Sequence, residues 1–552
     1  MVPEPKPSAV PRMRLRALAL AACLTATPLH AQRTPSAVPL QYQATPGSAW
    51  ERYVRALDLA GWVAPLNMGI RGWSHDQLRR GAAGSVDAPW DGAYTVAADR
   101  SVDLGWLPAR VAVTHNSDFP FQQGGGPVWY GRGATTELRF GGFWRAGPLS
   151  VVLSPVWYRS ENRDFRLAPT AHEGDGQFRS DLDPWGLDLP QRFGNEAYGR
   201  LDLGNSSVTL EGAGLVLGLS ASPQQWGPGD AHPLVLGAGG GGVPHVFLGT
   251  SRPLDAWFAR LHLRYMAGQT VRSAVQAAPE GERRAFLNGF VFVAEPRGLP
   301  GLEVGVTRLF HSQWPQDARL SSLLALPFEG LLKQNLDGTD QRVDDQYASA
   351  FVRWAHRSSG FEVFGEFVRT DHSWDLRTLA LEPEDFGGYA VGLRRVWKGR
   401  EGRLSTLRAE VTASGATHRE RGGARLYLAR RAGPIYLGPA QIGGLTHRGQ
   451  FLATVAGPYG NGQTLGFDRY GSKGRWSVDL DRRVVRDRTI GVVTDAQQGD
   501  VDVLHVLGGE WVRFAGNWDI EVGASGIYEV DRHLLEDAFN FRLRVGLGRR
   551  LR

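Results

Sequence analysis

The chain has 552 residues, of which 42% are hydrophobic, enough for a large core but too few for a helical membrane protein. Its formal net charge is +6 and no long basic run occurs, so nucleic acid is not an expected partner. The one cysteine, Cys23, excludes a disulfide framework and a cysteine-based metal site. Glycine is unusually frequent, with 71 residues, and aromatic residues are numerous, which is typical of β-structure with many turns.

Residues 1–31 have the pattern of a signal peptide. Three arginines precede a short apolar stretch at 17–27, and Leu29-His30-Ala31 offers a cleavage site. An alternative is the tetrapeptide ending at Cys23, which matches a lipoprotein cleavage box and would place a lipid on that cysteine. No later run of about 18 apolar residues occurs, so an exported protein of this sequence is either soluble or a β-barrel.

Residues 32–90 are predicted to form an N-terminal helical segment. Ser48 lies three residues before Glu51, the spacing of a capping box, in which the two side chains bind backbone N–H groups at the start of a helix. An apolar face with helical spacing follows, made of Trp50, Val54, Leu57 and Leu59. A second short helix is predicted to begin at Ser74.

From about residue 95 the hydrophobic period changes to two, as in β-strands. In residues 539–548 every second position is apolar and the others are polar or glycine, and in 257–265 one face carries Arg260, His262 and Arg264. A soluble β-sandwich or propeller would show the same alternation. Runs of about 9–11 residues and aromatic residues near the strand ends favour a transmembrane β-barrel over residues 91–552.

Neighbouring strands are predicted to be antiparallel, because short connections join them. Residues 134–145 and 149–158 form one such pair, and residues 353–356 and 361–367 form another. Longer polar, glycine-rich stretches are predicted to be the extended loops at one end of the barrel. These stretches are residues 115–133, 159–195, 222–244 and 313–345.

No motif predicts an enzyme or a bound cofactor. The chain has no G-x-S-x-G nucleophile elbow, no H-E-x-x-H metal motif and no phosphate-binding P-loop, and its 14 histidines are scattered. Glu362 and Glu366 share one face of a strand. Charged lining of a barrel lumen is the commoner reason for such a pair, and catalytic carboxylates are the rarer one. We therefore predict no catalytic residue, no metal and no cofactor.

The most unusual patch of the sequence is residues 224–250. Its glycines, including Gly227 and Gly229, allow backbone conformations closed to other residues, whereas prolines such as Pro228 stiffen the chain. Trp226 and His245 bracket the patch. One interpretation is an ordered loop folded against or into the barrel. The other is a sugar-binding platform, in which Trp226 stacks on a pyranose ring.

At this patch the sequence resembles the capsule-assembly outer-membrane proteins of the Wzi family. The resemblance covers roughly residues 48–550 and rests on short motifs in a fixed order. The motifs are Asn116-Ser117, Trp129-Tyr130-Gly131-Arg132-Gly133, Pro155, Ser160-Glu161-Asn162-Arg163-Asp164-Phe165, Phe193-Gly194, Leu203-Gly204-Asn205-Ser206, Gln225-Trp226-Gly227-Pro228-Gly229, Pro244-His245, Leu248-Gly249-Thr250, Pro253, His447, Gly449 and Gly457-Pro458-Tyr459-Gly460.

The resemblance implies an all-β membrane protein, an antiparallel transmembrane barrel of about 18 strands with a small N-terminal helical bundle at the periplasmic end. It implies a place in the cell outer membrane, among its lipids, and a lectin-like, non-enzymatic role in capsule assembly. That role is to bind capsular or exported polysaccharide and anchor it at the cell surface, with a polysaccharide export channel as a candidate partner.

The residues predicted to contact polysaccharide are loop residues: Trp226, His245, Trp129 and Trp185. Gly131, Gly133, Gly227, Pro228 and Gly229 are predicted to be structural residues of the motifs. Two other functions stay open at this point. One is an outer-membrane channel or porin-like transporter, and the other is an outer-membrane enzyme such as a lipase or protease.

Overall fold

The computed structural model describes residues 38–81, 88–95, 102–122, 126–170, 172–182, 186–276, 282–314, 320–328, 344–370, 380, 387–414, 435–436, 438, 442–458, 460–487 and 501–551. The predicted signal peptide, with Cys23, lies outside the described residues. So do Trp185, one of the predicted polysaccharide contacts, and Tyr459, part of a motif of the resemblance.

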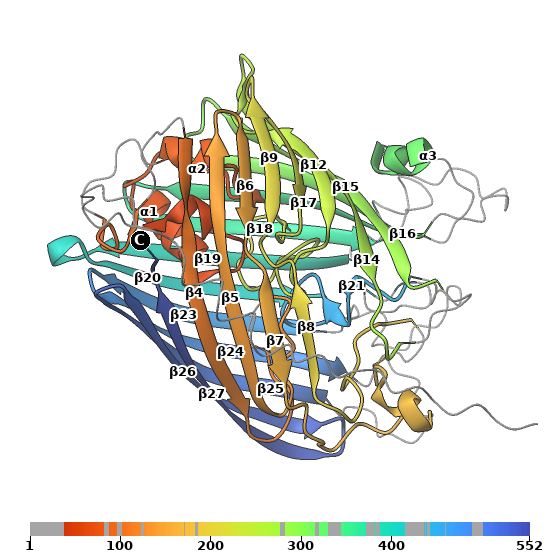
Figure 1. Ribbon diagram of the computed structural model, residues 1–552. Helices are drawn as coiled ribbons and strands as arrows, with labels where there is room; N and C mark the ends of the chain where they lie inside the picture. The colour runs from red at the N-terminus through yellow and green to blue at the C-terminus, as the bar shows by residue number, and fades with distance from the viewer. Residues whose placement is uncertain are drawn as a thin grey trace, which may run out of the picture. The chain divides into compact units, whose positions relative to one another are not determined.

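From Val102 onward the chain forms one closed antiparallel sheet, in which the last strand pairs with the first (Figure 1). The barrel segments are β4 Val102–Asn116, β5 Gly133–Ala146, β6 Leu149–Leu153, β7 Val156–Ser160, β8 Tyr198–Asp202, β9 Ser207–Gly212, β10 Leu215–Ser220, β12 His245–Thr250, β13 Leu254–Asp255, β14 Ala259–Val271, β15 Arg284–Pro296, β16 Leu302–Gln313, β17 Asp344–His356, β18 Phe361–Thr370, β19 Gly387–Lys398, β20 Leu404–Ala413, β23 Asn461–Gly471, β24 Gly474–Asp487, β25 Val501–Ala515, β26 Trp518–Arg532 and β27 Glu536–Arg549.

Three of the barrel strands are interrupted and count as two segments each. β6 and β7 both pair with β5 and are separated at Pro155, which has no N–H to donate to a neighbouring strand. β8 and β9 pair with β7 and β6, and β12 and β13 both pair with β14. The barrel therefore has 18 strands, and the predicted fold class is confirmed.

The apolar face of the strands points outward and the polar face points into the lumen. On the outer face of β27 Phe539 is 59% exposed, whereas Asn540 and Arg542 on the inner face of the same strand are buried. β24 repeats the pattern, with Trp476 exposed and Asp481 buried. A soluble sandwich buries the apolar face of its strands. The exposed apolar face seen here therefore rules out the soluble alternatives and is typical of the surface of a transmembrane barrel.

Long loops connect the strands at one end of the barrel. β4 and β5 are joined by 117–132, β7 and β8 by 161–197, and β10 and β12 by 221–244, within a few residues of the predicted bounds. At the other end the connections are short, such as 472–473 between β23 and β24. The expected division into a loop end and a turn end is thus confirmed, and in outer-membrane barrels the turn end faces the periplasm.

The N-terminal segment forms two helices, α1 Ala49–Leu59 and α2 His75–Gly81. The backbone N–H of Glu51 donates to Ser48 Oγ at 3.1 Å, so the predicted N-cap is confirmed. The predicted second start is confirmed as well, since Ser74 Oγ accepts from the N–H of Gln77. Short strands accompany the helices: β1 Val38–Pro39 pairs with β3 Tyr94–Thr95, and β2 is Ile70–Arg71.

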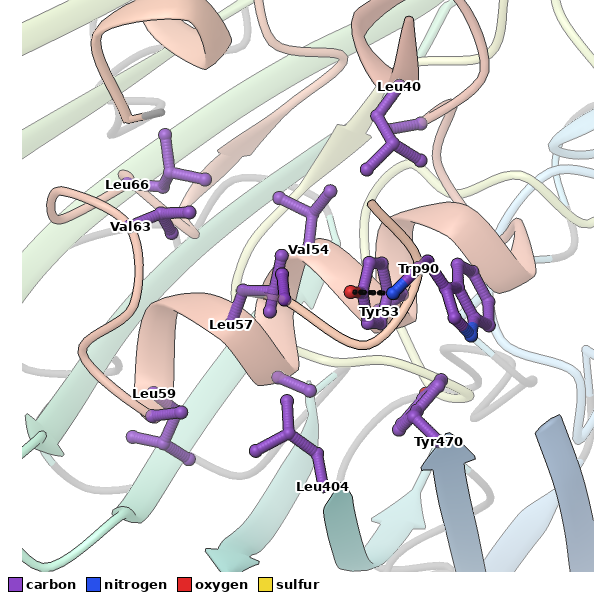
Figure 2. Close-up of a cluster of buried hydrophobic side chains, with 14 of the residues drawn as sticks. Leu40, Tyr53, Val54, Leu57, Leu59, Val63, Leu66, Trp90, Leu404 and Tyr470 are labelled. Carbon is purple, nitrogen blue, oxygen red and sulfur yellow. Dashed lines mark hydrogen bonds between the residues drawn. The ribbon is translucent and has the colours of Figure 1, made fainter. Parts of the chain in front are cut away.

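This segment packs inside the turn end of the barrel (Figure 2). Tyr53 of α1 stacks on Trp90 with 4.0 Å between ring centroids, and its hydroxyl accepts from the backbone N–H of Trp90. Leu404 and Tyr470, from strand ends of the barrel, complete the apolar cluster. The helices therefore lie at the end that the resemblance implied. In the described part of the chain, no helix is long and apolar enough to cross a membrane.

The remaining short elements lie in the connections. A third helix, α3, covers Leu320–Ala325, and the 3-10 turns are η2 Leu40–Tyr42, η3 Gly174–Phe178, η5 Leu326–Phe328 and η6 Arg400–Gly402. Two-residue strands β11 Gln225–Trp226, β21 Thr446–His447 and β22 Gln450–Phe451 belong to loops from the loop end. These three strands position the candidate site.

Candidate functional site

The loop that follows β10, residues 221–244, turns into the barrel, and we call it the inserted loop. Its strand β11 pairs with β2 of the N-terminal segment in a two-stranded antiparallel sheet, with Gln225 opposite Arg71 and Trp226 opposite Ile70. Beside this pair, the N–H of Gly227 donates to a backbone carbonyl of the N-terminal segment at 2.9 Å. Two segments that enter the lumen from opposite ends are therefore joined by backbone hydrogen bonds.

A second loop from the loop end, residues 442–456, also enters the lumen. The carbonyl of Leu452 accepts from the N–H of Gly237 at 2.7 Å. Leu452 and Leu234 are fully buried in the same apolar cluster as Trp226. We call the described residues of 38–95, 221–244 and 442–456 together the lumen plug.

Arg55 of α1 ties three parts of the molecule together. Its guanidinium donates to Glu362 on β18 at 2.7 Å and to the carbonyl of Pro228 in the inserted loop at 2.8 Å. Glu362 also binds Arg353 of β17 at 2.6 Å. A buried ion pair adds little net stability, but losing one partner leaves a charge without solvation. These contacts therefore hold the plug in one position rather than simply adding stability.

Asp230, also in the inserted loop, is surrounded by guanidinium groups. It binds Arg394 at 2.8 Å and lies 3.9 Å from Arg71 of the N-terminal segment. Burial by itself would raise the pKa of this carboxyl group, but Arg394, Arg55 and Arg408 hold it well below its ordinary value. Glu410 of β20 accepts hydrogen bonds from the backbone N–H groups of residues 230, 231 and 232. The loop is thus fixed to the wall by both charge and hydrogen bonds.

Two of the four predicted polysaccharide contacts are buried. Trp226 is 0% exposed and belongs to the apolar cluster of the plug. His245 lies at the start of β12, where its Nδ1–H donates to the carbonyl of Val243 at 2.6 Å, and it is buried as well. A ring without accessible surface has no face to offer a sugar. We therefore assign both residues to packing, and of the two interpretations of 224–250 the loop folded into the barrel describes the structure.

Trp129 is half-buried in the loop between β4 and β5. Its ring meets Phe193, of the loop between β7 and β8, edge to face at 5.0 Å between centroids. The residue thus joins two outer loops and keeps part of its surface accessible. Of the four predicted contacts, it is the one in the described part of the chain that has surface available to a ligand.

The motif glycines lie where the chain packs closely. Gly227 has φ +89° and a Cβ there would lie 2.5 Å from the Glu366 carboxylate, while Gly133 has φ +87°. A Cβ on Gly131 would lie 2.8 Å from a serine hydroxyl, and one on Gly229 would lie 2.9 Å from a backbone carbonyl. Steric constraints on the backbone therefore account for these residues, and Pro228 contributes the carbonyl that binds α1.

Gly227→Ala is expected to destabilise the protein by about 1–3 kcal/mol, because it combines backbone strain with a collision. Gly61→Ala is the matched control, since Gly61 has φ +68° but nothing within 4 Å of an added Cβ. The measurement is the urea midpoint of unfolding in detergent micelles. Equal losses for the two variants would show that the Glu366 contact is unimportant.

Acid is expected to loosen the inserted loop through His232. Its two ring nitrogens lie 2.8 Å and 3.0 Å from the hydroxyls of Thr454 and Thr464, and burial lowers its pKa from 6.5 to about 4. The unfolded chain therefore binds a proton between these pH values when the folded protein does not. Stability from this group is complete above pH 6.5 and is lost as the pH falls to about 4, by about 3 kcal/mol in total.

The test is to compare unfolding midpoints at pH 7 and pH 4 for the native protein and for His232→Gln. The variant should lose less stability on acidification. His356→Gln, at an exposed residue, serves as the control and should behave like the native protein. An unchanged pH dependence in His232→Gln would contradict the assignment.

The lumen is not completely filled. A cavity of about 420 Å³ lies beside the plug, along the inner faces of β24–β27, β4 and β5. Charged residues from many strands line it, among them Glu137, Glu521, Arg542 and Arg544. Sequence reasoning placed Arg542 and Arg544 on the polar face of a strand but could not bring them together with partners from β5 and β26.

The two carboxylates noted in the sequence both face the lumen from β18. Glu362 is bound by two arginines, and Glu366 accepts a hydrogen bond from Ser349 at 2.8 Å. These positions agree with charged lumen lining. Within the described residues, no group of three or more His, Cys, Asp or Glu side chains is arranged to hold a metal ion.

A closed 18-strand barrel with an apolar exterior and a plugged lumen is the class of protein that the fold defines. No protein-family model and no curated protein matches the chain significantly in sequence. Among solved structures, the chain is similar to Wzi of Escherichia coli, with a TM-score of 0.57, 13% identity, and coverage of 92% of this chain and 99% of that one. That protein is described as an outer-membrane, carbohydrate-binding β-barrel involved in group 1 capsule assembly.

The outer-membrane protein OprD of Pseudomonas aeruginosa also matches, with a TM-score of 0.37, 10% identity, and coverage of 81% of this chain and 94% of that one. At these identities the likenesses concern the fold alone. The predicted outer-membrane type of barrel agrees with the likeness to Wzi, while membership of the Wzi family stays a prediction.

Proposed function

We propose that the protein is a non-enzymatic barrel of the outer membrane that binds exported polysaccharide and holds it at the cell surface. The observation that carries this proposal is the lumen plug. The N-terminal segment and the inserted loop are joined by the β2–β11 pair, and Arg55 and Asp230 fix them to the wall. A solute channel needs a continuous aqueous path, whereas a surface-binding protein needs a rigid, closed platform.

The likeness of the fold to a carbohydrate-binding barrel supports the choice of polysaccharide as the ligand. The outer loops supply the surface for it, and a polymer offers many repeats, so weak individual contacts gain strength together. Trp129 and Trp185 are the proposed aromatic contacts, whereas Trp226 and His245 are left out because they are buried. Outer-membrane lipid would surround the exterior, and an export channel is the proposed neighbour.

A porin-like channel is the second candidate, and one observation favours it. The cavity of about 420 Å³ has the charged lining that a path for polar solutes would need. The two functions differ in a simple electrical property, because only a channel conducts ions in its native form.

The polysaccharide role is tested by deleting the gene in the organism that encodes it. Cell-bound and released polymer are measured separately, together with total polymer. Normal synthesis with polymer shed into the medium is the expected result, and the native gene supplied on a plasmid should restore attachment. Full attachment in the deletion strain would rule out the anchoring role there.

A further inference from the structure

The wall of the cavity beside the plug includes small residues of the barrel. Gly523 of β26 and Gly546 of β27 both line it. A Cβ added at Gly523 would meet no atom nearer than 3.6 Å. A cavity needs about 10–15 Å³ to hold one water molecule, so a space of about 420 Å³ is much larger than a bound water or a simple ion requires. The space could hold a sugar ring.

Arg542 points into this cavity from the inner face of β27 and is only 9% exposed. Within the part of the chain that the structure describes, no carboxylate pairs with it and no hydrogen bond satisfies its Nε–H. Its closest described interaction is with the ring of Tyr130, whose centroid lies 5.6 Å from the guanidinium carbon. A buried guanidinium without an anion is unfavourable, so this residue indicates a missing partner.

The carboxylates near Arg542 are already engaged. Arg544, two residues further along the same face, binds Glu137 and Glu521 at 2.5 Å each. Glu137 also accepts the hydroxyl of Tyr130 at 2.7 Å. Arg139 lies 3.7 Å from Glu137, so three guanidinium groups face two carboxylates. Among the described residues Arg542 is therefore the one of these three guanidinium groups without a carboxylate partner, and it lines the cavity.

We propose that the cavity is a binding site for a carboxylate-bearing sugar, whose carboxylate pairs with Arg542. Arginine presents two parallel N–H donors that match the two oxygens of a carboxylate. The remaining volume and the mixed polar and apolar lining accommodate a ring that carries hydroxyl groups on an apolar frame. This inference deepens the proposed function, because it names an acidic residue of the glycan as the ligand, and it rests on that function for the choice of a sugar over other carboxylates.

The test uses the purified full-length protein in detergent micelles and isothermal titration calorimetry. The probes are sodium glucuronate, methyl glucoside as the neutral ring, and sodium acetate as the bare carboxylate. We expect glucuronate to bind at least tenfold more tightly than either of the others. Arg542→Gln should weaken glucuronate binding at least tenfold, and Arg549→Gln, on the lipid-facing side of the same strand, should leave it unchanged.

A second pair of variants changes the volume of the cavity and leaves its charged residues unchanged. Gly523→Leu fills the space and should abolish glucuronate binding, whereas Gly526→Leu, on the outer face of the same strand, should not. Unfolding midpoints of all variants establish that each one folds. Absence of glucuronate binding by the native protein, equal binding by Arg542→Gln, or acetate binding as tight as glucuronate binding would each overturn the proposal.

The experiments distinguish failure of the cavity proposal from failure of the polysaccharide-anchoring proposal. If deletion of the gene releases polymer but the purified protein does not bind glucuronate, the cavity proposal is wrong and polysaccharide anchoring stands. If the polymer stays attached while Arg542 is required for glucuronate binding, anchoring is wrong and the protein has a sugar-acid site of another purpose.

Discussion

The full-length protein in planar bilayers is expected to show no stepwise ion conductance, whereas a variant without two of the three segments of its lumen plug is expected to conduct. The variant lacks residues 38–95 and has 224–242 replaced by a short glycine–serine linker. The barrel itself is held by strand pairing from β4 round to β27, which these changes leave intact. Removing the two segments would widen the lumen where the β2–β11 pair now lies.

Single deletions separate the contributions of the two segments. Removal of 38–95 alone should give smaller or briefer conductance steps, because the inserted loop is still held by Glu410. The shift in gel mobility on heating, which reports a folded barrel, accompanies each measurement. Steady conductance by the native protein would favour the channel function, and a folded but silent double variant would show that residues 442–456 close the lumen by themselves.

Arg353→Met is expected to destabilise the protein by about 3–5 kcal/mol, the cost of breaking a buried ion pair from one side. Arg353 is 0% exposed on β17, where it binds Glu362 and Glu303 and lies 3.5 Å from Asp58 of α1. Methionine fills a similar volume, but it has no charge, so these buried carboxylates lose the guanidinium group that now neutralises them. The wall and the N-terminal segment should therefore both lose stability.

The measurement is the urea midpoint of unfolding, with Arg403→Met as the matched control. Arg403 is 48% exposed and binds Glu401 at 2.6 Å in a turn, where an ion pair contributes about 0–1 kcal/mol. The control should therefore shift the midpoint only slightly. Similar shifts for the two variants would mean that the buried charges are relieved by water or by movement of the plug.

The architecture of the barrel was readable from the chain because it depends on local periodicity. Alternation with a period of two predicts strands, and short connections predict antiparallel neighbours, wherever those residues lie in the fold. The N-cap at Ser48 was equally accessible, since it joins residues three positions apart. Polar stretches between strands likewise located the long loops to within a few residues.

The same alternation fits a soluble sandwich as well as a barrel, so the pattern alone did not decide whether the apolar face of each strand is exposed or buried. Leu263 and Arg264 alternate as they would in a soluble sandwich, but in the barrel Leu263 is exposed and Arg264 is buried. The polar face is on the inside because the outer face of the closed sheet is the one that meets lipid. Closure depends on the pairing of β27 with β4, at opposite ends of the barrel sequence.

The position of the candidate site was likewise decided by tertiary structure. The pattern around Trp226 suits both an exposed platform and a buried anchor, and pairing of its strand with Ile70–Arg71 decides between them. Arg542 looks like any other lumen arginine in the sequence. Among the residues that the structure describes it has no ion-pair partner, because the nearby carboxylates, from β5 and β26, are bound by Arg544. The sequence by itself determined the strands, the helices and the antiparallel order of neighbouring strands, since these depend on neighbours in the chain. Burial and charge balance depend on distant partners, so only the tertiary structure decided which aromatic residues are accessible and which cation lacks an anion.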